Sequence, residues 1–248
     1  MTAALRAVAP APRRLKEMTP AEVAALVAED PRLIVPVGSC EPRGPHLPIG
    51  GATIIVERLA DDLSAAYGVL RAPAVEYGVS RVASHPSPGD GTLQRKTLHR
   101  VLNDLIAGWE RTSLTEFILL SANDHDLHQE ALLTLVTHDS RVRVADLWAV
   151  PIADLLAADP GPLPGGEAET ALLLHLAPSL VRQDLAVDHP VSPEEFRRYR
   201  AGRLRVPDAN TGALGMPRAA SALTGRAIYE RLRQRIGQRL FLSSAREG

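Results

Sequence analysis

Cysteine and aromatic residues are scarce in this chain. The single cysteine, Cys40, among 248 residues excludes an intramolecular disulfide framework and is typical of a reducing compartment. Aromatic residues make up 4% of the sequence while apolar residues make up 45%, so aliphatic side chains must fill the core. That apolar content allows a sizeable core, and the length suits one large α/β domain or two small ones.

An excess of one charge and long apolar runs are also lacking. The 28 Lys and Arg residues nearly balance the 29 Asp and Glu residues, so we expect no nucleic-acid partner and no membrane surface. The short basic stretch 197–205 is interpreted as a solvated helix face. No run of about 18 apolar residues occurs, and the Ala/Pro-rich N-terminus lacks the apolar core of a secretory signal. The sequence predicts a soluble, cytoplasmic protein.

Alternating strand and helix patterns predict the fold. Residues 1–17 are expected to form a flexible arm, because prolines and paired arginines offer little to bury, and residues 18–240 a single α/β domain. Apolar runs predict strands at 33–38, 69–74, 117–121 and 142–150, and helical spacing predicts helices opening at Thr19 and at 52–67, 95–111, 128–138, 167–177 and 217–238. This alternation predicts a three-layer α/β/α protein with a mainly parallel sheet.

Two loops dense in charged residues follow two of the predicted strands. Ligands of open parallel sheets bind beyond the carboxyl ends of the strands, which selects residues 39–51 and 122–128. We therefore expect one site built from two distant segments. A third loop, residues 78–92, is rich in glycine and proline, and an irregular loop of that length usually has a function.

Five motifs occur in the order typical of one enzyme family. Residues 35–50 read VPVGSCEPRGPHLPIG, and later come YGVS with PGDGTL at 77–93, NDH at 123–125, GEAET at 166–170 and GALGMP at 212–217. Over about residues 15–235 the chain resembles the creatininase family. The resemblance implies a creatininase-like fold and hydrolysis of amide-type C–N bonds with two divalent ions and a bridging water. It also implies a homo-oligomer, commonly a hexamer.

Only part of the family's metal-ligand set has a match here. Glu41 and His125 match a glutamate and a histidine ligand of the family. At the other ligand and catalytic positions this chain has a different residue. Arg43 stands at the position of the family's second histidine, Ala52 at that of its bridging aspartate, Pro164 at that of its catalytic histidine, and Met216 at that of the aspartate in its last motif.

Arg43 is the departure with the clearest physical consequence. A guanidinium group is always protonated and only donates hydrogen bonds, so Arg43 cannot bind a cation. We hypothesise that Arg43 replaces the second ion and pairs with Glu41 or Asp126; the alternative is that it turns to solvent.

The second interpretation is that these loops form a site for one zinc or manganese ion. Glu41, His125 and His128 are its candidate ligands, because a His-x-x-His spacing can place both rings on one face of a helix. The alternative is that Asp124 or Asp126 caps the helix that begins here and that His128 lies at the surface.

The remaining candidates follow from the other motifs. Glu169 is a candidate general base, although an acidic residue in the first turn of a helix is also favoured by the helix dipole. Candidate substrate-binding residues are His46, Ser80, His85, Asp124, Asp126 and Glu167; for His46 the alternative is a role in holding its loop.

Taken together, the sequence predicts an enzyme acting on an amide or related C–N bond of a small polar molecule. Its catalytic residues would be Glu41, Arg43, His125 and Glu169, with one divalent ion or none, and its reaction need not be hydrolysis. Two alternatives stay open: a catalytically inactive binding or scaffold protein, and an ordinary dinuclear amidohydrolase with substituted ligands. Because fold alone does not give function, the choice depends on the site.

Overall fold

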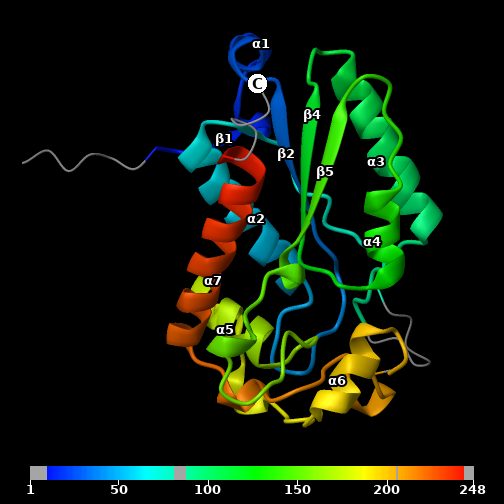
Figure 1. Ribbon diagram of the computed structural model, residues 1–248, viewed down its shortest axis with the longest axis vertical. Coiled ribbons are helices and arrows are strands. Elements are labelled where there is room, and N and C mark those ends of the chain that lie inside the picture. Colours follow the sequence, from blue (N-terminus) through cyan, green and yellow to red (C-terminus); the bar gives the residue numbers. More distant parts are fainter. Residues whose placement is uncertain (1–9, 81–87, 205, 243–248) are drawn as a thin grey trace, which may run out of the picture.

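A five-stranded parallel sheet lies at the centre of the computed structural model, which describes residues 10–80, 88–204 and 206–242 (Figure 1). The strand order is β1-β3-β2-β4-β5. The strands are β1 (Arg13–Arg14), β2 (Arg32–Val37), β3 (Leu70–Arg71), β4 (Glu116–Ser121) and β5 (Arg141–Asp146). In the centre of the sheet, Leu33 pairs with Phe117 and Phe117 pairs with Val142. Runs of apolar residues in β2 and β4 suit strands that are covered on both faces.

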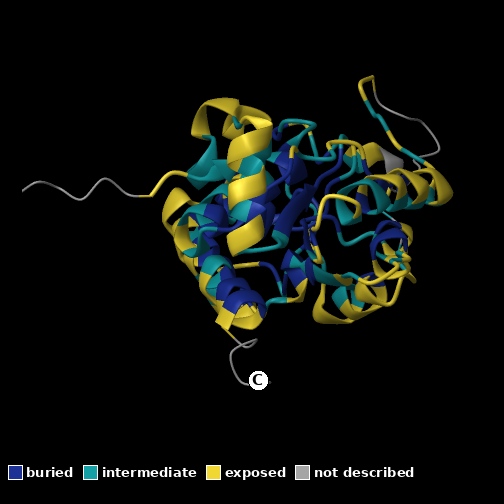
Figure 2. Cartoon of the chain, turned by 90° about the horizontal axis from the view of Figure 1, so that it is seen from above, coloured by how far each residue is buried: buried dark blue, intermediate teal, exposed yellow. Residues whose placement is uncertain are grey.

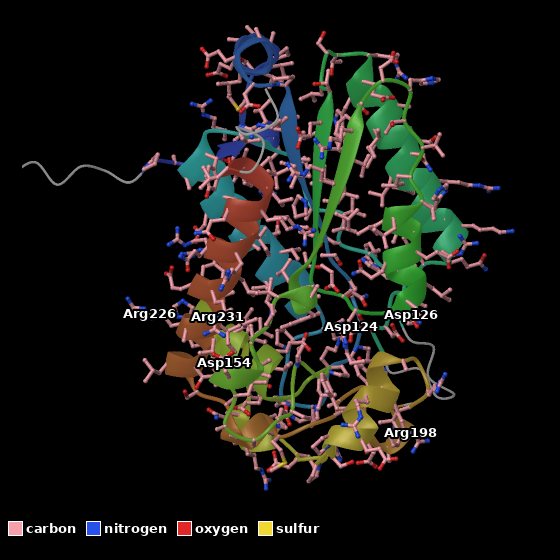
Figure 3. All side chains as sticks on the ribbon, viewed as in Figure 1. Asp124, Asp126, Asp154, Arg198, Arg226 and Arg231 are labelled. Carbon is pink, nitrogen blue, oxygen red and sulfur yellow. The ribbon has the colours of Figure 1, made fainter. Side chains whose placement is uncertain are left out.

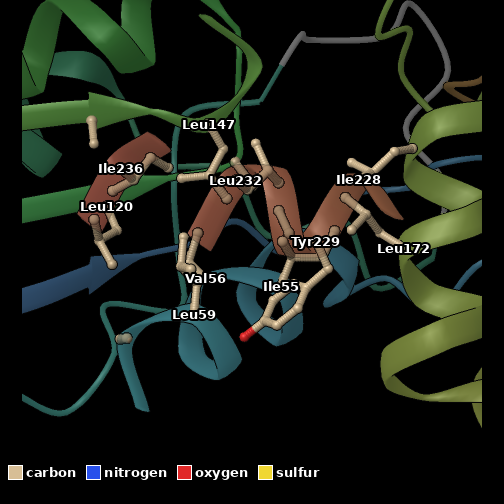
Figure 4. Packing of buried hydrophobic residues seen from close by; sticks show 14 of the residues in the cluster. Ile55, Val56, Leu59, Leu120, Leu147, Leu172, Ile228, Tyr229, Leu232 and Ile236 are labelled. Carbon is tan, nitrogen blue, oxygen red and sulfur yellow. The ribbon is translucent and has the colours of Figure 1, made fainter. Parts of the chain in front are cut away.

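Three helices cover one face of the sheet. They are α2 (Gly51–Tyr67), α5 (Glu167–Leu176) and α7 (Ala222–Gly237). Ile34 of β2 and Ile118 and Leu120 of β4 point to this face and pack in one apolar cluster with residues of the three helices. Figure 4 labels Leu120 of this cluster together with Val56 of α2, Leu172 of α5 and Leu232 of α7. Side chains of a strand alternate between its two faces, so their neighbours point the other way.

The opposite face is covered by α1 (Pro20–Glu29), α3 (Arg95–Glu110) and α4 (Asp126–Leu133). Leu33, Val35 and Leu119 pack there in a second apolar cluster. Buried residues follow the sheet and the inner faces of the helices, while the outer helix faces are exposed (Figure 2). The three-layer α/β/α architecture with a parallel sheet is therefore confirmed.

Local sequence signals set two of the helix boundaries as predicted. Thr19 caps α1 through a capping box with Glu22, and Pro20 takes the first helical position. Gly68 ends α2 in the left-handed conformation, with φ 69°. Short turns complete the chain: 3₁₀ turns at Leu15–Glu17, Leu147–Ala149, Ala153–Leu155, Pro178–Leu180, Gln183–Leu185, Asp208–Asn210 and Pro217–Ala219, and a π turn at Gln238–Leu242.

The predicted flexible arm differs from the structure at its C-terminal end. Arg13–Arg14 forms β1, which pairs with β3 at the edge of the sheet, and the Arg14 guanidinium donates to Asp61 of α2. An ion pair to α2, rather than an apolar pattern, holds this segment, which is why the sequence did not indicate it. Residues 1–9 of the predicted arm lie outside the described residues.

Other boundaries differ by several residues. The strand predicted at 69–74 has ladder pairing only at Leu70–Arg71, and the strand predicted to reach residue 150 ends at Asp146, where a 3₁₀ turn follows. The helix predicted at 128–138 is α4, which begins at Asp126 and ends at Leu133. The final helix begins at Ala222 and not at 217.

Helix α6 (Pro193–Arg200) lies beyond the sheet and is labelled at the lower end of Figure 1. It belongs to a segment whose two ends are joined where the backbones of His189 and Gly215 exchange two hydrogen bonds of 2.7 Å. A third apolar cluster anchors it, in which Tyr199 packs with Leu163 and Leu214. The basic side chains of α6 are exposed, but the helix is more than the solvated face that its charge indicated. Within the described part of the chain, no helix is long and apolar enough to cross a membrane.

Candidate functional site

The two predicted loops meet at the carboxyl ends of β2 and β4. Asn123, just after β4, donates from Nδ2 to Glu41 Oε1 over 3.0 Å, although 82 positions separate the two residues in the sequence. Ser39 Oγ donates to the same oxygen over 2.7 Å. The expectation of one site built from two distant segments therefore matches the geometry of these loops.

Arg43 and Glu41 form a buried ion pair at this junction. Arg43 Nη2 donates to Glu41 Oε1 over 2.8 Å, and the side chains of Arg43 and Glu41 are 6% and 8% exposed. The pairing partner is Glu41 and not Asp126, which lies exposed in the first turn of α4. Burial lowers the pKa of Arg43, but the carboxylates of Glu41 and Glu169 outweigh it and raise the pKa further, so the guanidinium stays charged.

Glu169 brings a second carboxylate to Arg43 from the first turn of α5. Its Oε2 accepts a hydrogen bond of 2.8 Å from the backbone N–H of Gly165, while its Oε1 lies 4.0 Å from Arg43 Nε. Both Oε1 and Arg43 Nε are buried, and neither has a hydrogen-bond partner among the residues that the structure describes. Burial raises the pKa of Glu169, and the positive charge of Arg43 only partly opposes that rise. A carboxyl group with a raised pKa can act as a general acid or base.

A small cavity lies against Arg43 and Glu169. Its volume of about 10 Å³ is that of roughly one water molecule. The remaining lining residues are Asp124, Trp148, Pro162, Leu163 and Pro164. The ring of Trp148 is fixed in position by a 2.6 Å hydrogen bond from its Nε1 to the carbonyl of Ala122. Asp124 Oδ2 accepts a 2.8 Å hydrogen bond from the hydroxyl of Tyr199, so α6 helps to close the cavity.

His128 lies in the interior and not at the surface. The backbone N–H of Val79 donates to its Nδ1 over 3.1 Å, and its Nε2 lies 3.1 Å from Ser121 Oγ. Because Nδ1 accepts, the neutral ring carries its proton on Nε2. Burial is the main cause that lowers the pKa of His128, to about 3. His125 precedes α4, and its Nδ1 lies 3.2 Å from the carbonyl oxygen of Val79.

Glu167 and His46 hold backbone segments in place. The carboxylate of Glu167 accepts hydrogen bonds from three successive backbone N–H groups, those of residues 157–159. His46 Nε2 lies 2.9 Å from Thr170 Oγ1, and burial lowers the pKa of His46 to about 4. Neither side chain lines the small cavity.

Of the two site residues predicted in the third loop, Ser80 and His85, the structure describes only Ser80. Ser80 is buried, its backbone N–H donates to Thr92 Oγ1 over 2.8 Å, and its hydroxyl has no partner among the described residues. His85 lies outside the described residues.

Several residues of the site were not predicted as site residues. Ser39 and Asn123 stand inside two of the recognised motifs, so their position next to Glu41 was the available signal. Tyr199 and Trp148 lie in segments without a motif, and only the fold brings them to Asp124 and to the cavity.

A much larger groove, of about 1130 Å³, lies elsewhere, between β5 and α7. Asp154 and Arg231 line this groove and form an ion pair. Figure 3 shows that they lie in a different part of the molecule from Asp124 and Asp126. None of the predicted site residues within the described ranges lines this groove, so its size does not make it the candidate active site.

Comparison with known proteins agrees with the fold and with the motifs. Residues 16–240 match the family model for creatininase, described as creatinine amidohydrolase. The chain belongs to the creatininase family. It is 31% identical over 211 residues to the mycofactocin precursor peptide peptidase of Mycolicibacterium smegmatis, with 80% of each chain covered. It is 26% identical over 237 residues to the creatinine amidohydrolase of Pseudomonas putida, covering 84% of this chain and 87% of the other.

Solved creatininases share the architecture. One, described as creatinine amidohydrolase (creatininase), superposes with a TM-score of 0.77 at 24% identity, covering 94% of this chain and 98% of the other. Another, described as Creatininase Mn, has a TM-score of 0.75 at 25% identity, covering 92% of this chain and 97% of the other. The names of these relatives describe peptidase or amidohydrolase activity, that is, hydrolysis of C–N bonds.

The residues of this family member do not fit the two-ion centre that the resemblance implies. Three donors already occupy Glu41 Oε1, both ring nitrogens of His128 are hydrogen-bonded, and the cationic Arg43 lies beside the carboxylates. Ala52 and Pro164 carry no side-chain donor atom for a metal. Across the described ranges, no group of three or more His, Cys, Asp or Glu side chains is arranged to hold an ion.

Proposed function

We propose that this creatininase-family chain hydrolyses an amide-type C–N bond of a small polar molecule, with the guanidinium of Arg43 in place of a metal ion. The observation that carries the proposal is the buried Arg43–Glu41 pair, which stands where the family's motif has a histidine ligand beside a glutamate ligand. The names of the relatives support the type of bond that is cleaved.

The charges around Arg43 support a fixed cation. Glu41 and Glu169 are both buried, and one guanidinium between them supplies the positive charge that a metal would otherwise provide. A preorganised positive charge in a site that excludes water can stabilise the oxyanion that develops when a carbonyl carbon is attacked. Glu169, whose pKa is raised by burial, is then the general base.

One observation favours a second candidate function, a catalytically inactive binding protein. The cavity beside Arg43 and Glu169, at about 10 Å³, is far smaller than the several hundred cubic ångströms usual for ligand pockets. An enzyme must therefore open this site when the substrate binds, whereas a scaffold has no such need.

Metal analysis and an activity screen test the proposal together. The protein is purified without chelators or added metal, and metal ions per chain are measured by mass spectrometry. Creatinine, small linear amides and short peptides are then incubated with the protein, with and without a chelator, and C–N cleavage is followed by release of amine. We expect less than one ion per chain and cleavage that the chelator does not change.

The Arg43→His variant sharpens the result because it restores the histidine typical of the family. If Arg43 replaces an ion, this variant binds zinc or manganese that the wild type does not bind. About two ions per wild-type chain would restore the ordinary dinuclear hydrolase and contradict the proposal. A metal-free protein that cleaves none of the compounds would favour the binding protein.

A further inference from the structure

Two buried polar atoms of opposite kind face each other without making a hydrogen bond. Within the described part of the chain, no group accepts the hydrogen of Arg43 Nε, and no group donates to Glu169 Oε1. They lie 4.0 Å apart, which is too far for a direct hydrogen bond. Leaving a buried polar atom unsatisfied is unfavourable, so two such atoms at one place point to a ligand between them.

Direct closure of the gap is prevented from both sides. Arg43 is held by the 2.8 Å hydrogen bond from its Nη2 to Glu41, and Glu169 by the 2.8 Å hydrogen bond that its Oε2 accepts from Gly165. Either side chain would have to give up its present partner to reach the other. The gap is therefore built into the site.

The cavity at this gap has the size and the polarity of a water site. Its volume is about 10 Å³, and Arg43, Glu169 and Asp124 are its three charged lining residues. A buried water needs about 10–15 Å³ and two to four polar partners. The oxygen of one water can accept from Arg43 Nε while its two hydrogens point to Glu169 Oε1 and to Asp124. Trp148, Leu163 and the two prolines leave no room for a larger ligand.

We propose that this cavity binds one water molecule between Arg43 Nε and Glu169 Oε1, and that this water is the nucleophile of the reaction. The role of the water as nucleophile rests on the proposed function, whereas the presence of the water does not. In the reaction, the water transfers a proton to Glu169 while its oxygen bonds to the carbonyl carbon of the amide. The C–N bond then breaks, and the nitrogen leaves with the proton from Glu169. The products are a carboxylic acid and an amine.

The segment that carries α6 covers this water. Leu163 lines the cavity and packs against Tyr199, whose hydroxyl donates to Asp124. The substrate carbonyl reaches the water only after these contacts open. These contacts limit the access of bulk water to the cavity, which strengthens the interactions of Arg43 and Glu169 with the bound water.

Crystal structures of the full chain, grown without added metal, test the water site without knowledge of the substrate. In the wild type we expect one density peak within hydrogen-bond distance of both Arg43 Nε and Glu169 Oε1. The matched variants are Glu169→Gln, which keeps a polar group of the same reach, and Glu169→Met, which removes it. The peak should persist in the glutamine variant and fall strongly or vanish in the methionine variant, where Arg43 and Glu41 remain as a neutral pair.

Three results would overturn the water site: an empty cavity, a direct Arg43–Glu169 hydrogen bond, or a peak at the shorter distances of a metal ion. An undiminished peak in the methionine variant would overturn the role of Glu169 in holding the water. For any compound that the wild type cleaves, Glu169→Gln should lower the rate by about 10²–10⁴-fold, and an unchanged rate would overturn the role as nucleophile. If no compound is cleaved, the proposed function fails while the density still decides the water site.

Discussion

Two buried arginines of this protein differ in how completely they are bonded. Arg71 of β3 donates from Nε to Asp61 over 2.9 Å, from Nη1 to the carbonyl of Ala72 over 3.0 Å and from Nη2 to Glu57 over 3.0 Å. Arg43 pairs with Glu41 through Nη2, while its Nε has no partner in the described ranges. Both residues are almost inaccessible to solvent, at 2% and 5%.

The surroundings of the two arginines explain the difference. Asp61 also accepts from Arg14, and Glu57 is one-third exposed, so the Arg71 cluster ties β1, β3 and α2 together at the edge of the sheet. Around Arg43 both carboxylates are buried and face a cavity at the carboxyl ends of the strands. A buried arginine with every nitrogen bonded is structural, whereas one with an unsatisfied nitrogen beside a cavity indicates a binding site.

Removing each arginine in turn gives the largest expected effect. Arg43→Met leaves Glu41 and Glu169 buried without a counter-charge, which should lower the free energy of unfolding by about 3–5 kcal/mol. Arg71→Met leaves Asp61 bonded to Arg14 and Glu57 in contact with solvent, so a loss of only about 1–2 kcal/mol is expected. Urea unfolding at neutral pH measures both. Equal losses for the two variants would show that the clusters do not differ in the way described.

The backbone around Arg43 provides a second, smaller contrast. Gly165 donates to Glu169 and has φ +61°, and an added Cβ would lie 2.5 Å from the carbonyl oxygen of Arg43. Gly165→Ala should therefore cost up to about 3 kcal/mol, through left-handed strain and displacement of the Glu169 partner. Gly50 is the matched control, because its φ is −87° and no atom of the described residues lies within 4 Å of an added Cβ. Gly50→Ala should change stability by less than about 0.5 kcal/mol; a similar loss in both would contradict the contrast.

The fold was predictable where the apolar pattern and local helix signals determine it. The strands at 33–38 and 117–121 and the helices at 52–67 and 95–111 differ from the structure by one residue at most at each end. Segments held by charge or by distant contacts were less predictable. Thus β1 depends on the pairing of Arg14 with Asp61.

The site was only partly predictable for the same reason. The motifs indicated Glu41, Arg43 and Glu169, which the structure brings together. They indicated Glu169 as a general base and Glu167 as a substrate-binding residue, but the carboxylate of Glu167 instead accepts from the backbone N–H groups of residues 157–159, a contact that no motif signals. Tyr199 reaches Asp124 through an anchored segment that has no sequence signal.

The smallest expected difference between the two regions is in how their stability depends on pH. In the Arg43 region this dependence arises from the buried His128. Burial opposes protonation of this ring most strongly, the charges of His125 and Arg43 add to it, and Asp124 acts in the opposite sense. A proton on Nδ1 would also point at the N–H of Val79, which now donates to that nitrogen. The pKa of His128 is lowered from 6.5 to about 3, so the unfolded chain takes up the proton first. The stability that His128 contributes is therefore complete above pH 6.5 and is lost as the pH falls toward about 3.

Between about pH 7.5 and about pH 5 this loss should amount to about 2 kcal/mol. Burial lowers the pKa of His46 to about 4, so this group also loses stability as the pH falls. Burial raises the pKa of Asp159 to about 6, which has the opposite effect. The measured pH dependence of stability is therefore the sum over several groups. The contribution of His128 is isolated as the difference in pH dependence between wild type and His128→Gln in urea unfolding. The same substitution at the exposed His138 is the matched control for replacing a histidine by glutamine. A His128→Gln variant that loses stability between these two pH values as steeply as the wild type would show that this buried ring is not held neutral.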